Sequence, residues 1–263
     1  MRILTIIKQV PDSNAHIKVL GDGSGIDTTG LKMVCDPFDE FGIELAVQTR
    51  EKRKDVEEIV AMLLGPDKAA ETLRVALAMG ADRGVHICDD ALISQDEQFI
   101  AQVLAAAIKK EGVTFDLIVR GKQTIDLDSG ETGPALAERL GLPHVAAITA
   151  LDVSADGKTF KACRRIEGAE EVVEGSLPAV LTIEKGLVEP RYPSLPNLMK
   201  AKKKPVTRLT SADLGGLNKE SRGCRFISLS PPAPRAACRF IEGEPPQVAK
   251  ELVRLLREEA KVL

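Results

Sequence analysis

The chain reads FDLIVRGKQTIDLDSGETGPALAERLG over residues 115–141. The apolar run at 115–119 predicts a buried strand, and residues 135–141 predict a short helix that ends at Gly141. The polar stretch at 121–134 then forms a long turn at the carboxyl end of a sheet, where open α/β folds bind ligands. Its glycines allow close backbone approach, and free N–H groups at the helix start attract anions. The stretch therefore predicts a nucleotide site.

Composition argues against several classes of protein. A formal net charge of −3 over 263 residues provides no basic field for nucleic acid. Trp is absent and Tyr192 is the single tyrosine, so a surface that stacks on bases is not expected. The length suffices for one large α/β domain, which we predict at residues 1–225, followed by a C-terminal arm at 226–263.

Cysteine usage and hydropathy bear on the compartment. The five cysteines form no C-x-x-C pair, which favours a reducing compartment and argues against a zinc site. The apolar run at the N-terminus is too short for a signal peptide, and residues 2–7 predict a first strand. No apolar stretch in the sequence is long enough to span a membrane. We therefore expect a cytoplasmic protein without membrane insertion.

Strand and helix patterns alternate through the first half of the chain. Strands are predicted at 2–7, 56–64, 83–87 and 115–120, and helices at 37–53, 68–79 and 96–111. The first of these helices has a well-formed start, because Asp36 can cap it and Pro37 suits its first position. This alternation predicts an α/β fold with a Rossmann-like, mostly parallel sheet and helices on both faces.

The second half of the chain differs in character. Strands at 145–153, 159–166 and 170–174 predict an antiparallel meander at one sheet edge, and 177–183 predict another buried strand. Residues 184–225 are expected to be poorer in regular structure. The proline-rich tail ends in an amphipathic helix at 247–261, and because this helix has an apolar face to bury, we expect the arm to wrap around a partner subunit.

No motif for covalent or acid–base catalysis is present. Gly121-Lys122 is not a Walker phosphate loop, because Asp116 replaces the upstream glycine and Gln123 follows the lysine. The glycine-rich stretch at 21–25 predicts a hairpin tip and fails the dinucleotide fingerprint, since Ile26 takes the last glycine position. The three histidines lie far apart in sequence, with no nucleophile motif. We therefore predict no catalytic residue and a binding or carrier protein.

Three carboxylates in the turn, Asp126, Asp128 and Glu131, have more than one interpretation. Carboxylates spaced along a loop occur in cation sites. The same residue types also form turns and cap helices, and we favour this interpretation over a metal site. In a nucleotide site a carboxylate would hold ribose hydroxyls. The amides that would hold phosphate are those of Ser129, Gly130 and Thr132.

An apolar segment beside a lysine run suggests a docking site. Residues 195–199 read LPNLM, and the lysine-rich run at 200–204 follows directly. Apolar side chains in a proline-bounded loop with a charged rim are typical of a docking anchor for an acidic partner. The alternative is an ordinary solvated stretch, and these residues alone leave both interpretations open.

Together these segments resemble the beta subunit of electron-transfer flavoprotein, over nearly the whole chain. The matching stretches are VALAMGADRG at 75–84, GKQTID at 121–126, EPRY at 189–192 and LPNLMKAKKK at 195–204. The family signature, which ends on the strand after Pro178, is nearly met by residues 162–182. Ala169 stands where an acidic residue or glycine is usual.

The resemblance implies an electron carrier that works as a heterodimer. Its alpha subunit would carry most of an FAD site, which this chain closes, while this chain would bury a structural AMP. The arm at 226–263 would contact the alpha subunit. Electrons would come from acyl-CoA-type dehydrogenases and pass to a membrane quinone oxidoreductase. The docking residues implied by the resemblance are Leu195, Pro196, Met199, Lys200 and Lys203.

The resemblance also implies the residues of the nucleotide site. The family often has Asn-Pro at the first helix start, where Asp36 keeps the capping ability and adds charge. Near the flavin, Ser13 stands at a position that can be aromatic in other members, so Phe38 is the candidate for contact with the ring. The residues carried over for AMP are Ile6, Asp36, Pro37, Phe38, Asp39, Leu64, Gly121, Lys122, Gln123, Thr124, Ile125, Asp126, Leu127, Asp128, Ser129, Gly130, Glu131 and Thr132.

Two alternatives remain open at this point. One branch of the family bifurcates electrons, oxidises NADH, holds a second FAD in place of AMP and typically reads DGDTAQVGP. Residues 126–134 of this chain read DLDSGETGP. Pro134 matches the bifurcating branch, whereas Leu127 and Thr132 match the AMP branch, and we favour AMP. The second alternative is a stand-alone sensor of adenine nucleotides.

Overall fold

The computed structural model describes residues 1–218, 220, 222–224 and 227–263. Its strands are β1 (Arg2–Ile7), β2 (Gln9–Pro11), β3 (Met33–Cys35), β4 (Glu58–Leu64), β5 (Arg83–Ile87), β6 (Leu117–Gly121), β7 (His144–Val153), β8 (Thr159–Ile166), β9 (Ala169–Ser176), β10 (Ala179–Ile183) and β11 (Val206–Leu209). Its α-helices are α1 (Pro37–Lys52), α2 (Ala70–Met79), α3 (Glu97–Lys110), α4 (Thr132–Leu140), α5 (Leu195–Ala201) and α6 (Pro245–Glu258). The expected domain boundary between residues 225 and 226 lies outside the described residues.

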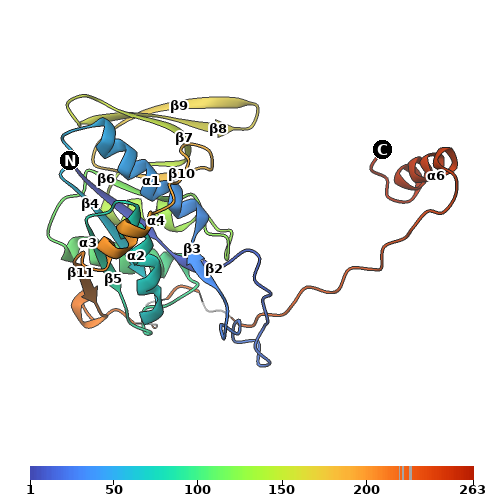
Figure 1. Ribbon diagram of the computed structural model, residues 1–263, viewed down its shortest axis with the longest axis horizontal. Coiled ribbons are helices and arrows are strands. Elements are labelled where there is room, and N and C mark those ends of the chain that lie inside the picture. The colour runs from blue at the N-terminus through green and yellow to red at the C-terminus, as the bar shows by residue number, and fades with distance from the viewer. Residues whose placement is uncertain (219, 221, 225–226) are drawn as a thin grey trace.

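One nine-stranded sheet forms the centre of the molecule, in the order β11-β5-β4-β1-β6-β10-β7-β8-β9 (Figure 1). Neighbours are parallel from β11 through to β7, and β8 and β9 continue antiparallel. In the middle, Leu4 of β1 lies opposite Val60 on one side and Ile118 on the other. The Rossmann-like, mostly parallel sheet predicted from the sequence is confirmed.

Helices cover both faces of this sheet because successive strand residues point to opposite sides. Ile3 of β1 belongs to a buried cluster with residues of α1 and α2, whereas Leu4 belongs to a second cluster with residues of α3 and α4. The central strands β1, β4 and β6 are buried along almost their whole length. Such continuous apolar strands are typical of a parallel sheet covered on two sides.

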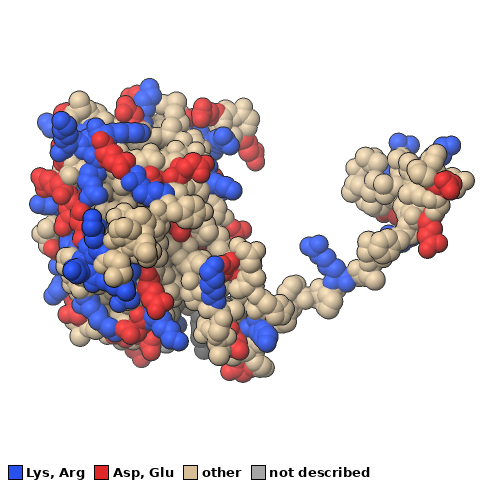
Figure 2. Space-filling model, in the orientation of Figure 1, with Lys and Arg blue, Asp and Glu red and all other residues tan. Residues whose placement is uncertain are grey.

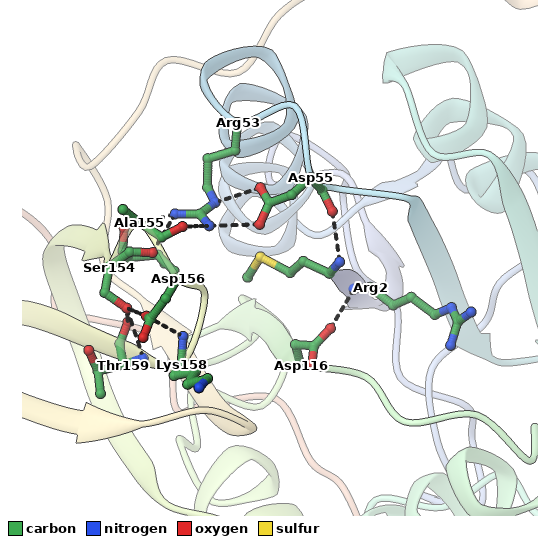
Figure 3. Close-up of polar contacts among 11 residues, drawn as sticks. Arg2, Arg53, Asp55, Asp116, Ser154, Ala155, Asp156, Lys158 and Thr159 are labelled. Atoms are coloured by element: carbon green, nitrogen blue, oxygen red, sulfur yellow. Dashed lines mark hydrogen bonds and ion pairs between the residues drawn. The ribbon is translucent and has the colours of Figure 1, made fainter.

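The antiparallel meander lies at one edge of the sheet, as predicted. β7 pairs with β10 on one side and with β8 on the other, and β9 forms the edge. Arg53, which follows α1, donates hydrogen bonds to the carbonyl oxygens of Val153 (3.0 Å) and Ser154 (2.7 Å) and pairs with Asp55 (Figure 3). These bonds attach the turn between β7 and β8 to the end of α1.

Two regions contain more regular structure than the sequence indicated. β2 and β3 form a small antiparallel sheet of their own, which was not predicted. Within residues 184–225, α5 begins after the capping residue Ser194, and β11 pairs parallel with β5 at the second edge of the main sheet. Both elements are short and mostly exposed, so neither has the apolar periodicity by which longer elements are recognised. The hairpin tip at 21–25 is closed by an antiparallel bridge between Val19 and Ile26.

The C-terminal arm leaves the body of the molecule, and α6 lies at its far end (Figure 1). None of the residues of α6 is buried, although its sequence is strongly amphipathic. Leu252 is 45% exposed and Val253 is 44% exposed.

Among the described helices, none has the length and apolar character needed to cross a membrane. Lys and Arg side chains alternate with Asp and Glu over the face of the body drawn in Figure 2.

Candidate nucleotide site

The candidate site lies at the carboxyl ends of β1, β4 and β6. The chain builds outward from β1 to β4 and β5 on one side, then crosses β1 to place β6 on the other side. Open α/β sheets bind ligands at this kind of reversal. A cavity of about 130 Å³ lies here, between the strand ends and the first turns of α3 and α4. Its lining includes Ile6, Leu64, Pro66, Ile93, Ser94, Glu97, Arg120, Thr124 and Thr132.

Asp39 joins the start of α1 to the ends of two strands. Its carboxylate, 1% exposed, accepts the backbone N–H of Gly121 and the backbone N–H of Lys8, each at 2.8 Å. Gly121 has no room for a side chain, since an added Cβ would lie 2.4 Å from the Cβ of Phe38. The glycine therefore permits the close approach of β6 to α1 on which the bond to Asp39 depends.

Asp36 has a similar role one turn earlier. It is fully buried, and one oxygen caps α1 by accepting the N–H of Phe38 at 2.9 Å, as the sequence predicted. Its other oxygen accepts the N–H of Ile125 at 2.7 Å. The two aspartates thus use all four carboxylate oxygens on backbone donors. They form the scaffold of the loop that follows β6.

Glu97 holds the other end of this loop. Its carboxylate is 8% exposed, and Oε2 accepts the N–H of Glu131 at 3.0 Å and the N–H of Thr132 at 2.8 Å. This bond caps α4, whose own N-cap residue provides no side-chain bond. The amide of Thr132, which was expected to hold phosphate, is therefore taken by a side chain from α3. Glu97 was not among the predicted residues, although an acidic pair, Asp96-Glu97, at a predicted helix start signals a capping role.

The three loop carboxylates point to separate partners. Asp126 forms an ion pair with Lys8 (2.7 Å). Asp128 accepts from the side chain of Gln123, and Glu131 accepts from Gln98 at 2.6 Å. In the part of the chain that the structure describes, no group of three metal-ligating side chains comes together.

Several hydrogen-bond donors at the cavity have no partner. Arg120 is 6% exposed and Thr124 is 1% exposed, yet Arg120 Nε and Thr124 Oγ1 make no hydrogen bond to any described residue. The backbone amides of Ser129 and Gly130 also make no hydrogen bond within the described residues, but they lie in the more exposed loop before α4 and do not line the cavity. Buried polar groups are normally satisfied. The buried donors of Arg120 and Thr124 therefore fit a ligand that carries acceptor atoms.

Burial raises the pKa values of the two aspartates that form this scaffold. Desolvation raises the pKa of Asp39 to about 7, against the opposing effect of the Arg120 guanidinium. Burial also raises the pKa of Asp36, although two backbone hydrogen bonds favour its charged form. Both carboxyl groups thus bind a proton more tightly in the folded chain than in an unfolded one.

The structure gathers some of the predicted residues around the cavity and leaves others outside its lining. Arg120 was missed, although a charged residue inside an apolar strand pattern is a signal that it serves a site. The predicted residues that line the cavity are Ile6, Asp39, Leu64, Thr124 and Thr132. Those outside the cavity lining, at the start of α1, at the end of β6 and in the loop that follows β6, are Asp36, Pro37, Phe38, Gly121, Lys122, Gln123, Ile125, Asp126, Leu127, Asp128, Ser129, Gly130 and Glu131.

Comparison with known proteins identifies the family of the chain. Residues 24–214 match the family model described as "Electron transfer flavoprotein domain". The chain is 39% identical to the electron transfer flavoprotein subunit beta of Bacillus subtilis over 266 residues, which cover 100% of both chains. It is 38% identical to the subunits of the same name from Bradyrhizobium diazoefficiens and from Homo sapiens, which it covers over 100% and 99% of their length.

The chain belongs to the electron transfer flavoprotein beta-subunit family. Phe38 and Ser13 are the two positions of this chain that were expected near the flavin. Phe38 is half-buried beneath Lys122, whose Nζ lies 5.5 Å from the centre of the ring. Lys122 is held in turn by Glu184 at 2.7 Å. Ser13 lies exposed on the loop after β2.

The segment expected to dock dehydrogenases in this electron transfer flavoprotein subunit is helical rather than a loop. α5 packs against α2 through the buried Ala201, and it leaves Leu195 74% exposed and Met199 57% exposed. Around the place of α5, beside α2 in Figure 1, Figure 2 shows an uncharged patch bordered by basic side chains. Lys200 and Lys203 are exposed, as predicted for a solvated run.

Lys204 differs from the other lysines of this run. Its Nζ donates to the carbonyl oxygens of Leu77 (2.8 Å) and Ala81 (2.5 Å) at the end of α2. Burial lowers the pKa of this ammonium group. Lys204 is therefore a structural residue that caps α2 and anchors the segment after α5.

Proposed function

We propose that this chain is the beta subunit of a heterodimeric electron-transfer flavoprotein that carries electrons from acyl-CoA-type dehydrogenases. FAD shared with an alpha subunit would do the redox chemistry when bound, and this chain would position it and bury a structural AMP. The reduced complex would pass its electrons to a membrane quinone oxidoreductase. In this proposal residues 1–225 form the nucleotide-binding domain, and 226–263 form the arm that contacts the alpha subunit.

One observation carries the nucleotide part of the proposal. The unpartnered donors of Arg120 and Thr124 face a cavity at the strand-order reversal of a doubly wound sheet. Apolar side chains such as Ile6, Leu64 and Ile100 line the same cavity and suit a planar base. The residues that would hold AMP are therefore those of the cavity together with the amides of Ser129 and Gly130.

The C-terminal helix supports the subunit part of the proposal. The apolar face of α6 is formed by Val248, Leu252, Leu255 and Leu256, and no residue of this helix is buried. An exposed apolar face of this kind is typical of a protein–protein contact. The relatives that match over their full length are themselves named as subunits. These points disfavour a stand-alone nucleotide sensor.

The exposed end of α5 supports the docking part. Leu195 lies at the first turn, where Pro196 fixes the backbone, and basic side chains follow it along the chain. An aliphatic anchor with a charged rim suits an acidic partner surface. A cytoplasmic location completes the proposal, and all five cysteines are free, which agrees with a reducing compartment.

The proposal is tested by co-expressing this chain with its alpha subunit and purifying the complex. Bound nucleotides are extracted and counted by chromatography, and reduction of the flavin by an acyl-CoA dehydrogenase is followed by absorbance. One FAD and one AMP per heterodimer, with rapid flavin reduction, are the expected results. A stable, flavin-free monomer that never associates with the alpha subunit would refute the proposal.

The bifurcating alternative is favoured by one residue, Pro134, which matches that branch of the family. It predicts two FADs and no AMP per heterodimer, together with oxidation of NADH. The same nucleotide count separates the two functions, because AMP and a second FAD would occupy the same site.

A further inference from the structure

A carboxylate occupies part of the position at which phosphate was expected. Glu97, in the first turn of α3, directs Oε2 toward the start of α4, where it accepts the amides of Glu131 and Thr132 at 3.0 and 2.8 Å. The side chain is 8% exposed and lines the cavity. Helix N-termini attract anions, and here the anion belongs to the chain itself.

Arg120 gives an independent indication that the cavity takes a ligand. It comes from β6 rather than from α3 or α4, and its Nε is buried without a partner among the described residues. Thr124 Oγ1 is likewise buried without a hydrogen-bond partner among the described residues. A buried donor that lacks a partner is unfavourable until a ligand or a water molecule satisfies it. The cavity therefore offers donors to a ligand beside a fixed negative charge.

Some charged side chains around the cavity have partners within the chain, and others do not. Lys8 is already committed to Asp126, and Asp39 accepts two backbone amides. The guanidinium of Arg120 forms no ion pair within 4 Å in the described part of the chain, although its charge acts on the nearby Asp39 carboxyl group. One cation is thus available to a ligand, and it suits a single phosphate group better than two.

We propose that Glu97 sets the number of phosphates that the site accepts. This inference rests on the proposed function, in which an adenine nucleotide binds here. The amides of Ser129 and Gly130 remain for one phosphate. A second phosphate would have to displace the Glu97 carboxylate or lie against it, and like charges in a weakly polar cavity repel more strongly than in water. Glu97 thus selects a nucleoside monophosphate over a diphosphate or a dinucleotide such as FAD.

The test compares the wild-type heterodimer with Glu97→Gln. Glutamine keeps the size of the side chain and one oxygen that can accept an amide, but it removes the charge. Each complex exchanges its nucleotide in an equimolar mixture of AMP and ADP, and the bound nucleotides are counted after denaturation. We expect the preference for AMP over ADP to fall about tenfold in the variant, as expected for the loss of a like-charge contact.

Glu138→Gln is the matched control. It removes the same charge from the exposed C-terminal part of α4, so the AMP-to-ADP ratio should equal that of the wild type. Thermal unfolding of each complex checks the fold. If glutamine weakens the cap of α4, Glu97→Thr provides a second neutral side chain with an acceptor oxygen.

Two results would overturn the inference. The first is an unchanged AMP-to-ADP ratio in the neutral variants, and the second is the absence of adenine nucleotide from every complex. The second result would also remove the structural AMP from the proposed function, whereas the first would not. The role as an electron carrier is decided separately, by the FAD content of the heterodimer and its reduction by a dehydrogenase. A complex that takes up ADP only after the charge is removed supports the inference.

Discussion

The carboxylate of Asp39 accepts the backbone N–H of Gly121 at 2.8 Å, although the two residues are 82 positions apart in the chain. This bond joins the first turn of α1 to the end of β6 across the reversal in strand order. The loop that follows β6 therefore begins from a fixed point inside the fold rather than from a free surface turn.

Asp39→Asn should destabilise the chain by about 1–3 kcal/mol, because the amide NH2 group can only donate, whereas either oxygen of a carboxyl group can accept a backbone N–H whether or not the group is protonated. The free energy of unfolding is measured by urea denaturation at pH 6. Glu71→Gln is the control, since Glu71 is exposed on α2, and a change within about 0.5 kcal/mol is expected there. A variant Asp39→Asn as stable as the control would show that the two bonds contribute little.

The effect of Asp39→Asn should depend on pH. Burial raises the pKa of Asp39 to about 7 in the folded chain, above the value in an unfolded chain. A raised pKa stabilises the fold at low pH, and this contribution is lost as the pH rises from about 4 to about 7. The difference in stability between wild type and variant should therefore shrink between pH 5 and pH 8. A difference that stays constant over this range would mean that Asp39 is ionised throughout.

Arg120→Met should have opposite effects on nucleotide binding and on the stability of the nucleotide-free complex. Methionine keeps the apolar packing and removes a buried cation whose Nε has no hydrogen-bond partner among the described residues. We expect the affinity for AMP to fall about tenfold, a loss of about 1.4 kcal/mol. The nucleotide-free complex should melt at the same temperature or higher. Equilibrium dialysis and thermal unfolding measure the two effects, and unchanged AMP affinity would remove Arg120 from the site.

Leu195→Ala should reduce the second-order rate of flavin reduction by the dehydrogenase about tenfold, because it removes an exposed anchor at the start of α5. FAD content and thermal stability should not change, since Leu195 is 74% exposed. Ile166→Ala, on the edge meander, truncates another exposed aliphatic residue and is expected to leave the rate as in the wild type. Equal rates for Leu195→Ala and wild type would exclude α5 as the docking element.

Leu255→Asp should weaken association with the alpha subunit about 100-fold without unfolding this chain. The substitution places a charge on the apolar face of α6, and loss of one central anchor in an interface costs about 2–3 kcal/mol. Circular dichroism of the isolated chain should be unchanged, because α6 buries no residue. Lys250→Asp, on the opposite side of the helix, is the control. Sedimentation measures the heterodimer, and equal effects of both variants would argue against an apolar contact.

Local patterns were sufficient to predict most of the central fold. Each buried strand carries a continuous apolar run, and the helix at Asp36-Pro37 has its own start signal, so both could be recognised from neighbouring residues. β11 could not, because three of its four residues are exposed and it exists through its pairing with β5. The order of the strands likewise depends on contacts between distant segments.

The site was predicted less completely than the fold. Glycine and helix-start signals were sufficient to predict the loop after β6 and its place at the carboxyl end of the sheet. The cap of α4 could not be predicted in this way, because it comes from Glu97, which is 34 and 35 positions away from the two residues whose amides it accepts. As a result α4 begins at Thr132, rather than at residue 135 as the sequence suggested. A cap contributed by another element leaves no signature in the segment that it caps.

The arm has a consequence for how fast the two subunits assemble. Residues 227–244 are without helix or strand and, when extended, reach about 60 Å. In the proposed heterodimer α6 binds the alpha subunit, and the body of this chain would then stay tethered within that radius. Its second contact then becomes an intramolecular event at a high effective concentration. A complex held in this way can separate at one contact and close again without its subunits diffusing apart.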